Sequence, residues 1–436
     1  MLRHLLAPVI ALLAFCGPGV RGAETAGDTR VFTEVAESKI RLTSTQRVRL
    51  QGYRSLPSTA DSRIVRVNVA RLANEPRVDL DVFGERVPMS RERIEQRRSG
   101  DYSWFGRETH DGSRAILVVR DGRLTGSIRD GRPEDPRQTH AGYAVRYLGG
   151  DLHVVLEVID GFLPPEEPPG EPDDLLGPPA VGQTGCIPTF TALVAYTPAV
   201  AAHEGDPVGF VQLLIDEFND IFSNTQVNLH VNLVHTYEVD YDEYEPIGNG
   251  QNAQDQSIAD FLDRLVQDGD GYMDEVHDRR DTYGADVVVL LGHHASPPFS
   301  GNASGKAEQV VADADTAFAV VADGYAPGPY HFVFHHEVGH LLGLRHDPDT
   351  DSATEPFAYG HGYIYVQGET KWRDVMAYNP ESICGAWPGC LKIPNFSNPD
   401  VDFDGVPTGT YAESDNARVL EERICTVAAF RQGVWM

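Results

Sequence analysis

The stretch His331–Asp347, HFVFHHEVGHLLGLRHD, decides how the rest of the chain is interpreted. His336 and His340 are spaced i and i+4, so on a helix their side chains lie on one face, about 5.4 Å apart along the axis. Gly343 can adopt a positive φ and end the helix, after which the chain can return His346 as a third ligand. Three protein ligands leave one position open, which is typical of catalytic zinc.

Glu337 follows the first histidine and places a carboxylate near the metal that is not needed as a ligand. We expect it to act as the general base on zinc-bound water during hydrolysis. The alternative is an amphipathic helix that carries its histidines by chance. Gly343 and His346 at the required spacing make such a match far rarer than the bare HExxH pattern, so the catalytic interpretation is favoured.

The segment HEVGHLLGLRHD resembles the zinc signature of the metzincin metalloproteases, and Asp347 after the third histidine resembles the reprolysin (adamalysin) branch. The resemblance implies a downstream Met-turn, and Asp374–Tyr378 (DVMAY) fits it. Met376 would then lie under the metal without binding it. The resemblance also makes Tyr378 a second candidate catalytic residue, as a weak metal ligand or as a hydrogen-bond donor to the oxyanion. Asp347 is expected to anchor the turn that carries the third imidazole.

The composition indicates a globular protein of more than one domain. Its 436 residues suggest two domains, and a hydrophobic content of 41% is enough to build cores. A formal net charge of −29 argues against nucleic acid or an anionic membrane as the main partner. The expected partner is a protein or peptide substrate, and the oligomeric state is not predicted.

Residues 1–23 have the features of a secretory signal peptide, with a short basic start at Arg3 and His4. The apolar stretch Leu5–Phe15 is too short to span a membrane. Leu13–Cys16 weakly resembles a lipoprotein signal, although Phe15 is bulky where a small residue is expected. We expect a soluble mature protein that is secreted or periplasmic.

Four cysteines remain once the signal is removed, an even number that predicts two disulfides in an exported protein. Of the three possible pairings we expect Cys384–Cys390, a local loop, and Cys186–Cys425, a clasp between the ends of the second unit. A cysteine metal site is the alternative. It is disfavoured because the histidine motif already provides a site.

Residues 24–162 are predicted to form a mainly antiparallel β domain. The β-forming runs between Asp-Gly turns are Ser62–Val69, Val78–Phe83, Arg114–Val119, Gly142–Tyr147 and Leu152–Val158. Tyr102–Gly106 is interpreted as aromatic core packing. The position before the protease resembles a pro-region. This domain contains no cysteine that could bind the zinc and keep the protease latent, so any latency must be steric or use another zinc ligand. The Pro- and acid-rich residues 163–185 are predicted to be an exposed linker and the place of maturation cleavage.

Residues 186–436 alternate strand and helix patterns, which predicts an α/β sheet. The expected strands are Phe190–Ala195, Val227–His235, Asp286–Leu291 and Ala317–Val321, and the expected helices are Val208–Phe222, Ser257–Val266 and Asn416–Phe430. The resemblance implies a metzincin-type domain, a mixed twisted sheet with an active-site helix, in which Ala317–Val321 is the sheet edge above the cleft. Pairing of an extended peptide with that edge favours endopeptidase action. Phe396–Pro399 is expected to shape a substrate pocket.

Other histidines and two acidic runs are not assigned to the metal site. Helical spacing turns His335 away, while His293, His294, His331 and His361 fit no spacing rule. Asp400–Gly405 matches the first half of an EF-hand loop, but position twelve is Tyr411 and not glutamate. Asp268–Gly271 is shorter still. Solvated turns are preferred for both runs, and calcium stays a minor possibility.

Two other functions stay open from the sequence. One is a non-catalytic binding or adhesion protein with a structural zinc, which Glu337 speaks against because such a site has no need of that carboxylate. The other is a zinc hydrolase of non-peptide amides, which the motif alone does not separate from a peptidase.

Overall fold

The computed structural model describes residues 29–97, 100–108, 112–129, 141–159, 163–164, 166–171, 186–243, 257–293, 303–386 and 389–431. The predicted signal peptide, His294 and most of the predicted linker lie outside these residues. None of the described helices combines the length and the apolarity that a membrane crossing requires.

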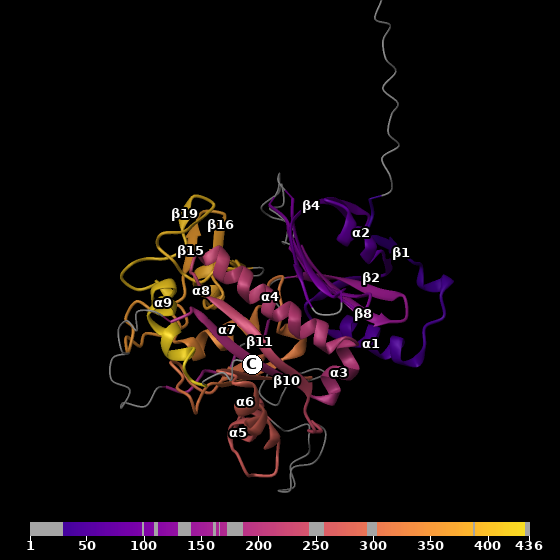
Figure 1. Ribbon diagram of the computed structural model, residues 1–436. Helices are drawn as coiled ribbons and strands as arrows, with labels where there is room; N and C mark the ends of the chain where they lie inside the picture. Colours follow the sequence, from indigo (N-terminus) through magenta and orange to yellow (C-terminus); the bar gives the residue numbers. More distant parts are fainter. Residues whose placement is uncertain are drawn as a thin grey trace, which may run out of the picture.

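The N-terminal unit, residues 29–159, is built on a nine-stranded antiparallel sheet in the order β1-β2-β9-β8-β7-β6-β5-β4-β3 (Figure 1). The strands are β1 (Phe32–Glu34), β2 (Thr59–Val67), β3 (Arg77–Val82), β4 (Glu85–Gln96), β5 (Tyr102–Arg107), β6 (Arg114–Arg120), β7 (Arg123–Arg129), β8 (Ala141–Gly149) and β9 (Leu152–Ile159), with helices α1 (Ser44–Ser55) and α2 (Val69–Asn74) and the 3-10 turn η1 (Glu37–Lys39). A bridge between Arg30 and Asp79 joins the β1 and β3 edges, so the sheet nearly closes. The predicted antiparallel β architecture is confirmed, and Trp104 is fully buried as expected.

The second unit contains a five-stranded sheet in the order β11-β10-β12-β14-β13, parallel except for β13. Its strands are β10 (Thr189–Tyr196), β11 (His230–Glu238), β12 (Val287–Gly292), β13 (Gly305–Ala307) and β14 (Phe318–Ala322). Its helices are α3 (Pro198–Glu204), α4 (Pro207–Thr225), α5 (Ile258–Val266), α6 (Glu275–Tyr283), α7 (Val333–Leu342), α8 (Glu381–Cys384) and α9 (Asn416–Val427), with the 3-10 turn η4 (Asp323–Tyr325). Short strands complete the C-terminal part: β15 (Ile364–Gln367), β16 (Thr370–Arg373), β17 (Leu391–Lys392), β18 (Asp402–Phe403) and β19 (Val406–Pro407). The predicted mixed α/β sheet is confirmed.

The prediction that Ala317–Val321 forms the edge of this sheet is wrong. β14 lies between β12 and β13, and the three residues of β13 form the edge instead. β13 contains a glycine and a lysine, so neither hydrophobic alternation nor β propensity marks it as a strand. The true edge therefore passes beside α7 through the backbone of Gly305–Ala307.

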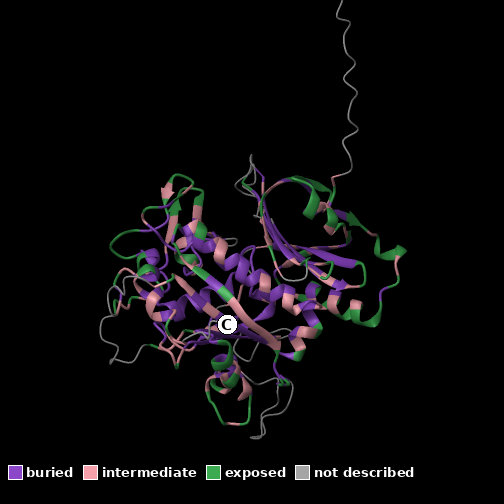
Figure 2. Ribbon diagram, in the orientation of Figure 1, coloured by how far each residue is buried: buried purple, intermediate pink, exposed green. Residues whose placement is uncertain are grey.

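Helix α4 is packed between the two sheets, and Figure 2 shows it buried along most of its length. Its apolar residues enter the core of the second unit, while Leu213 packs against Phe105, Ile116 and Val118 of the N-terminal sheet. Arginines of the N-terminal unit also meet acids of α3, α4 and the α4 N-cap: Arg97 with Asp216, Arg114 with Asp220 at 3.1 Å, Arg120 with Asp206 at 2.8 Å, and Arg146 with Glu204 at 3.4 Å. The two units thus share an interface that is apolar at its centre and ionic around it.

Both predicted disulfides are present. Cys186–Cys425 joins the start of the second unit to α9, and Cys384–Cys390 closes a loop of the C-terminal part. The acidic run at Asp400–Gly405 folds into the β18–β19 hairpin, and Asp268–Gly271 lies in a turn held by Asp274.

Candidate metal centre

Three imidazoles converge at the end of α7 as the sequence predicts. The Nε2 atoms of His336, His340 and His346 lie 3.0–3.1 Å from one another. Gly343, at φ 111°, ends the helix in the left-handed conformation, and the chain then turns back to bring His346 to the other two rings. All three side chains are buried.

The hydrogen bonds of the two helical histidines show that the three rings fit a metal ion. His336 Nδ1 donates to the Val375 carbonyl at 3.0 Å, and His340 Nδ1 donates to the Leu344 carbonyl at 2.8 Å. Neutral rings of this tautomer leave both Nε2 atoms as acceptors that face each other, which is unfavourable unless a cation lies between them. Burial lowers the pKa of all three imidazoles, to about 4 for His340, and so favours the neutral form that binds metal.

Glu337 lies on α7 between the two helical ligands and is fully buried. Burial raises the pKa of this carboxyl well above its ordinary value, the negative charge of Glu166 raises it further, and the amide of Ala307 partly opposes both. Neither carboxylate oxygen has a hydrogen-bond partner of normal geometry among the described residues. A Cβ on Gly305 of β13 would lie 2.5 Å from Glu337 Oε1, so the edge strand passes close over this group.

The predicted Met-turn packs directly beneath the histidines. A Cβ on Gly339 would lie 2.6 Å from the Met376 sulfur, which explains why the helix carries glycine there. Asp347 joins the two parts: its carboxylate accepts from the Tyr378 amide at 3.0 Å and from the Thr350 amide at 3.1 Å. The Tyr378 ring lies 4.3 Å from the His346 ring. These contacts agree with the anchoring role expected of Asp347.

Comparison with known proteins decides the family. The model of metallo-peptidase family M12 of the reprolysin type matches residues 189–384. A peptidyl-Asp metalloendopeptidase of Stenotrophomonas maltophilia (strain R551-3) is 35% identical over 402 residues, covering 86% of this chain and 88% of that protein. A peptidyl-Asp metalloendopeptidase of Xanthomonas campestris pv. campestris is 32% identical over 448 residues, covering 97% of this chain and 98% of that protein. This chain belongs to the reprolysin-like metallopeptidases.

The resemblance stated from the zinc motif is thereby confirmed, and this metallopeptidase is a metal-dependent hydrolase of peptide bonds in proteins or peptides. The relatives argue against the non-catalytic binding protein considered above. Metalloproteinase-II of Bacteroides fragilis aligns with a TM-score of 0.35 at 14% identity, over 62% of this chain and 81% of that chain, which is too low to bear on the fold.

A cavity of about 290 Å³ adjoins the metal centre of this metallopeptidase and is lined in part by Tyr378 and Thr350. Two buried cations, Arg373 and Lys392, also line it. Lys392 Nζ donates to the His331 carbonyl at 3.1 Å, and its positive charge adds to the burial that lowers the pKa of His331. Neither cation has a signal in the sequence, because both lie on short strands far from the zinc motif.

The expected pocket segment Phe396–Pro399 does not line this cavity. Phe396 packs against Phe218 and Phe222 of α4, and the hydroxyl of Ser397 donates to the His361 carbonyl at 2.7 Å. The segment is mostly buried and packs in the core, and its part in shaping a substrate pocket stays a prediction.

The unassigned histidines have distinct surroundings. His335 Nε2 bonds the Leu214 carbonyl at 2.9 Å, so it faces away from the metal as predicted. His361 Nδ1 donates to the His346 carbonyl at 2.8 Å and thereby holds the backbone of the third ligand. No spacing rule pointed to that contact in the sequence. His331 is buried next to Tyr325, with ring centroids 5.3 Å apart.

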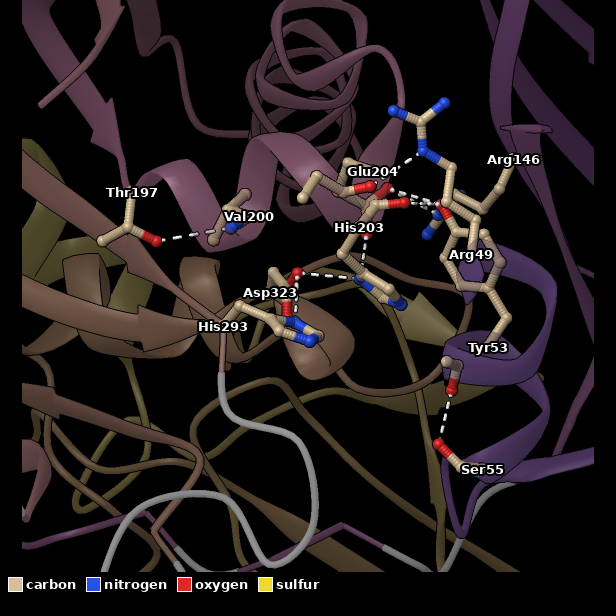
Figure 3. Close-up of polar contacts among 12 residues, drawn as sticks. Arg49, Tyr53, Ser55, Arg146, Thr197, Val200, His203, Glu204, His293 and Asp323 are labelled. Atoms are coloured by element: carbon tan, nitrogen blue, oxygen red, sulfur yellow. Dashed lines mark hydrogen bonds and ion pairs between the residues drawn. The ribbon is translucent and has the colours of Figure 1, made fainter. Parts of the chain in front are cut away.

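His293 belongs to a second buried cluster with His203 and Asp323 (Figure 3). His203 Nδ1 and His293 Nδ1 lie 2.9 and 3.0 Å from the same Asp323 oxygen. These three groups could ligate a metal, yet His203 Nε2 has no partner in the described part of the chain, whereas a metal-bound imidazole usually donates from its second nitrogen. The cluster is therefore better described as two imidazoles that share one carboxylate than as a metal site.

The N-terminal unit covers this second cluster. The Tyr53 ring of α1 lies 4.4 Å from the His203 ring, and its hydroxyl donates to the His203 carbonyl at 3.0 Å. Burial alone would lower the pKa of His203, but the charges and hydrogen bonds of Asp323 and Glu204 outweigh it and raise the pKa to about 10. The cluster thus places a positive charge among carboxylates at the contact between the two units.

Proposed function

We propose that this chain is a zinc endopeptidase, with His336, His340 and His346 as the zinc ligands. The observation that carries the proposal is the meeting of three imidazole Nε2 atoms beside the buried carboxylate of Glu337. A bound zinc ion supplies Lewis acidity, which lowers the pKa of water and polarises the scissile carbonyl. Glu337 takes the proton of the attacking water and passes it to the leaving amine.

Tyr378 is proposed as a hydrogen-bond donor to the oxyanion that develops on the scissile carbonyl. Its ring lies 4.3 Å from that of His346, and its hydroxyl reaches the Glu166 carbonyl at 3.4 Å. Burial raises the pKa of this hydroxyl, so it keeps its proton and can donate. A substrate carbonyl replaces that of Glu166 in the active enzyme.

The substrate is proposed to be an extended peptide with an acidic side chain next to the scissile bond. β13 is the edge strand of the sheet, to which such a peptide can pair, and this favours cleavage within a chain. The relatives are named peptidyl-Asp metalloendopeptidases, and the buried cations Arg373 and Lys392 line the cavity beside the metal centre. A carboxylate entering that cavity gains charge-assisted hydrogen bonds that a neutral side chain does not.

The chain is proposed to be exported with residues 24–162 as a pro-region and 163–185 as the segment cleaved during maturation. Two disulfides are typical of proteins that leave the cytoplasm. Residues 1–23 would direct that export.

The test uses the processed protein, with and without Glu337→Gln, on a peptide library read by mass spectrometry. Metal content is measured for both proteins. We expect one zinc per chain in each, cleavage next to aspartate by the wild type, and activity lowered at least a thousandfold in the variant, on the order expected for removing a catalytic base. Retained activity in Glu337→Gln would reject the assignment of the base. Cleavage of non-peptide amides alone would reject the peptidase.

A further inference from the structure

The two cations of the cavity beside the metal centre lie on neighbouring strands. β16 and β17 pair in parallel, and Arg373 stands opposite Lys392 in the register. Both side chains line the cavity of about 290 Å³, so they point to the same side of this small sheet. The Ile393 amide donates to the Arg373 carbonyl at 2.8 Å and extends the pairing by one bond. A carboxylate that enters the cavity therefore meets both cations together.

The placement of Lys392 needs support from outside its own strand. β17 has two residues, so few backbone hydrogen bonds hold it against β16. Arg373 and Lys392 are both buried, and two positive charges on adjacent strands repel each other more strongly in a buried site than in water. The flexible stem of a lysine also lets the ammonium group move when its backbone moves. A pocket with fixed charges therefore requires an anchor for the chain that leads to Lys392.

The Cys384–Cys390 disulfide provides this anchor. Cys390 directly precedes β17, and the disulfide ties it to the end of helix α8. The Cys390 amide donates to Oδ1 of Asn379 at 2.8 Å, and Nζ of Lys371 on β16 donates to the Cys384 carbonyl at 2.7 Å. Both cysteines are buried. The covalent bond and these two hydrogen bonds hold the chain on both sides of the bridge.

The segment before the bridge also forms part of the cavity wall. Asn379 and Pro380 line the cavity, and the Cys384 amide donates to the Pro380 carbonyl at 2.8 Å. Gly389, at φ 79°, lets the chain pass close to this wall, because a Cβ there would lie 2.3 Å from side-chain atoms of Asn379. The disulfide thus joins two parts of one wall, the Asn379 side and the Lys392 side.

The metal centre is held by other contacts. The three histidines are oriented by hydrogen bonds with Val375, Leu344 and His361, none of which belongs to the disulfide loop. The bridge spans a sequence separation of 6, against 239 for Cys186–Cys425, so it removes less entropy from the unfolded chain. Its main effect is therefore expected on the pocket and not on metal binding or on the fold as a whole.

We infer that the Cys384–Cys390 disulfide determines specificity, because it fixes Lys392 beside Arg373 and so gives the cavity its preference for an acidic side chain next to the scissile bond. This inference rests on the proposed endopeptidase function and its acid-binding cavity. Neither cysteine lines the cavity, so both are positioning residues that act through Lys392.

The experiment uses the processed, zinc-loaded enzyme and two peptides that differ only in aspartate or asparagine next to the scissile bond. Cys384→Ser/Cys390→Ser removes the bridge. Cys186→Ser/Cys425→Ser is the matched control, which removes the disulfide that lies outside the cavity. Lys371→Met is a milder variant that keeps the bridge and removes its hydrogen bond to β16. The constants kcat and KM are measured for both peptides, and zinc content is measured for every protein.

We expect Cys384→Ser/Cys390→Ser to lower the ratio of kcat/KM for the aspartyl peptide over the asparaginyl peptide by about tenfold, the size expected when one hydrogen bond to a charged group is weakened. The change should fall on KM, with zinc retained. Lys371→Met should lower the ratio by a smaller factor, and Cys186→Ser/Cys425→Ser should keep the wild-type ratio.

An unchanged ratio in the bridge variant, or equal losses on both peptides, would overturn the inference. If the bridge variant does not fold, as shown by absent zinc, the decision passes to Lys371→Met, in which an unchanged ratio rejects the inference. Lys392→Met separates the two levels of failure. If the wild type does not prefer the aspartyl peptide, the proposed cavity assignment fails and this inference fails with it. If Lys392→Met loses the preference while the bridge variant keeps it, the pocket stands and only the role of the disulfide is rejected.

Discussion

Replacing Asp347 by alanine tests how far the metal centre depends on the link between the third-ligand turn and the Met-turn. The buried carboxylate accepts from the Tyr378 amide at 3.0 Å, and that amide has no second acceptor among the residues that the structure describes. The Thr350 amide also bonds the Asp347 main-chain carbonyl at 3.0 Å, so it keeps a partner in the variant. One hydrogen bond to a charged acceptor is therefore lost, which costs about 1.5–3 kcal/mol of unfolding free energy.

The same change should weaken zinc binding, because the turn that carries His346 is no longer tied to Tyr378. Groups that orient a ligand are worth about 10–100-fold in metal affinity. Zinc affinity is measured by competition with a chelating dye, and stability by urea unfolding of the metal-free protein. Asp349→Ala, at an exposed neighbouring position, is the control. If Asp347→Ala matches this control in both measurements, the anchoring role is wrong.

Three further predictions concern the catalytic carboxylate, the cation pocket and the second histidine cluster. Gly305→Ala places a methyl group 2.5 Å from Glu337 Oε1, so the carboxylate must move, and kcat/KM of the processed enzyme should fall by about a hundredfold with zinc content unchanged. Lys392→Met should lower kcat/KM for an aspartyl peptide by about 10–100-fold and leave the asparaginyl analogue nearly unaffected; equal losses would refute the pocket assignment. His203 has a raised pKa, near 10 against an ordinary 6.5, so its stabilisation is complete below about pH 6.5 and is lost as the pH rises to about 10. The difference in Tm between wild type and His203→Gln should accordingly shrink over that range, and a constant difference would contradict a protonated imidazole.

The sequence predicted the meeting of the three histidines well because the parts that bring them together are local. Histidines at i and i+4, a glycine able to take positive φ and a following histidine define the geometry with little help from the rest of the fold. The disulfide pairs also followed from the sequence, through loop length and position. Where one helix turn or one short loop carries the information, pattern and structure agree.

The features that the sequence missed are those made by long-range contacts. β13 is a strand because its backbone pairs with β14, and its own residues, Gly305–Ala307, have no strand pattern. Lys392 reaches the centre from a two-residue strand, and its burial depends on the surrounding fold. The linker composition indicated an exposed segment, yet Glu166 is buried because residues 166–171 form backbone hydrogen bonds with the edge of the sheet at Gly305, Glu308 and Val310.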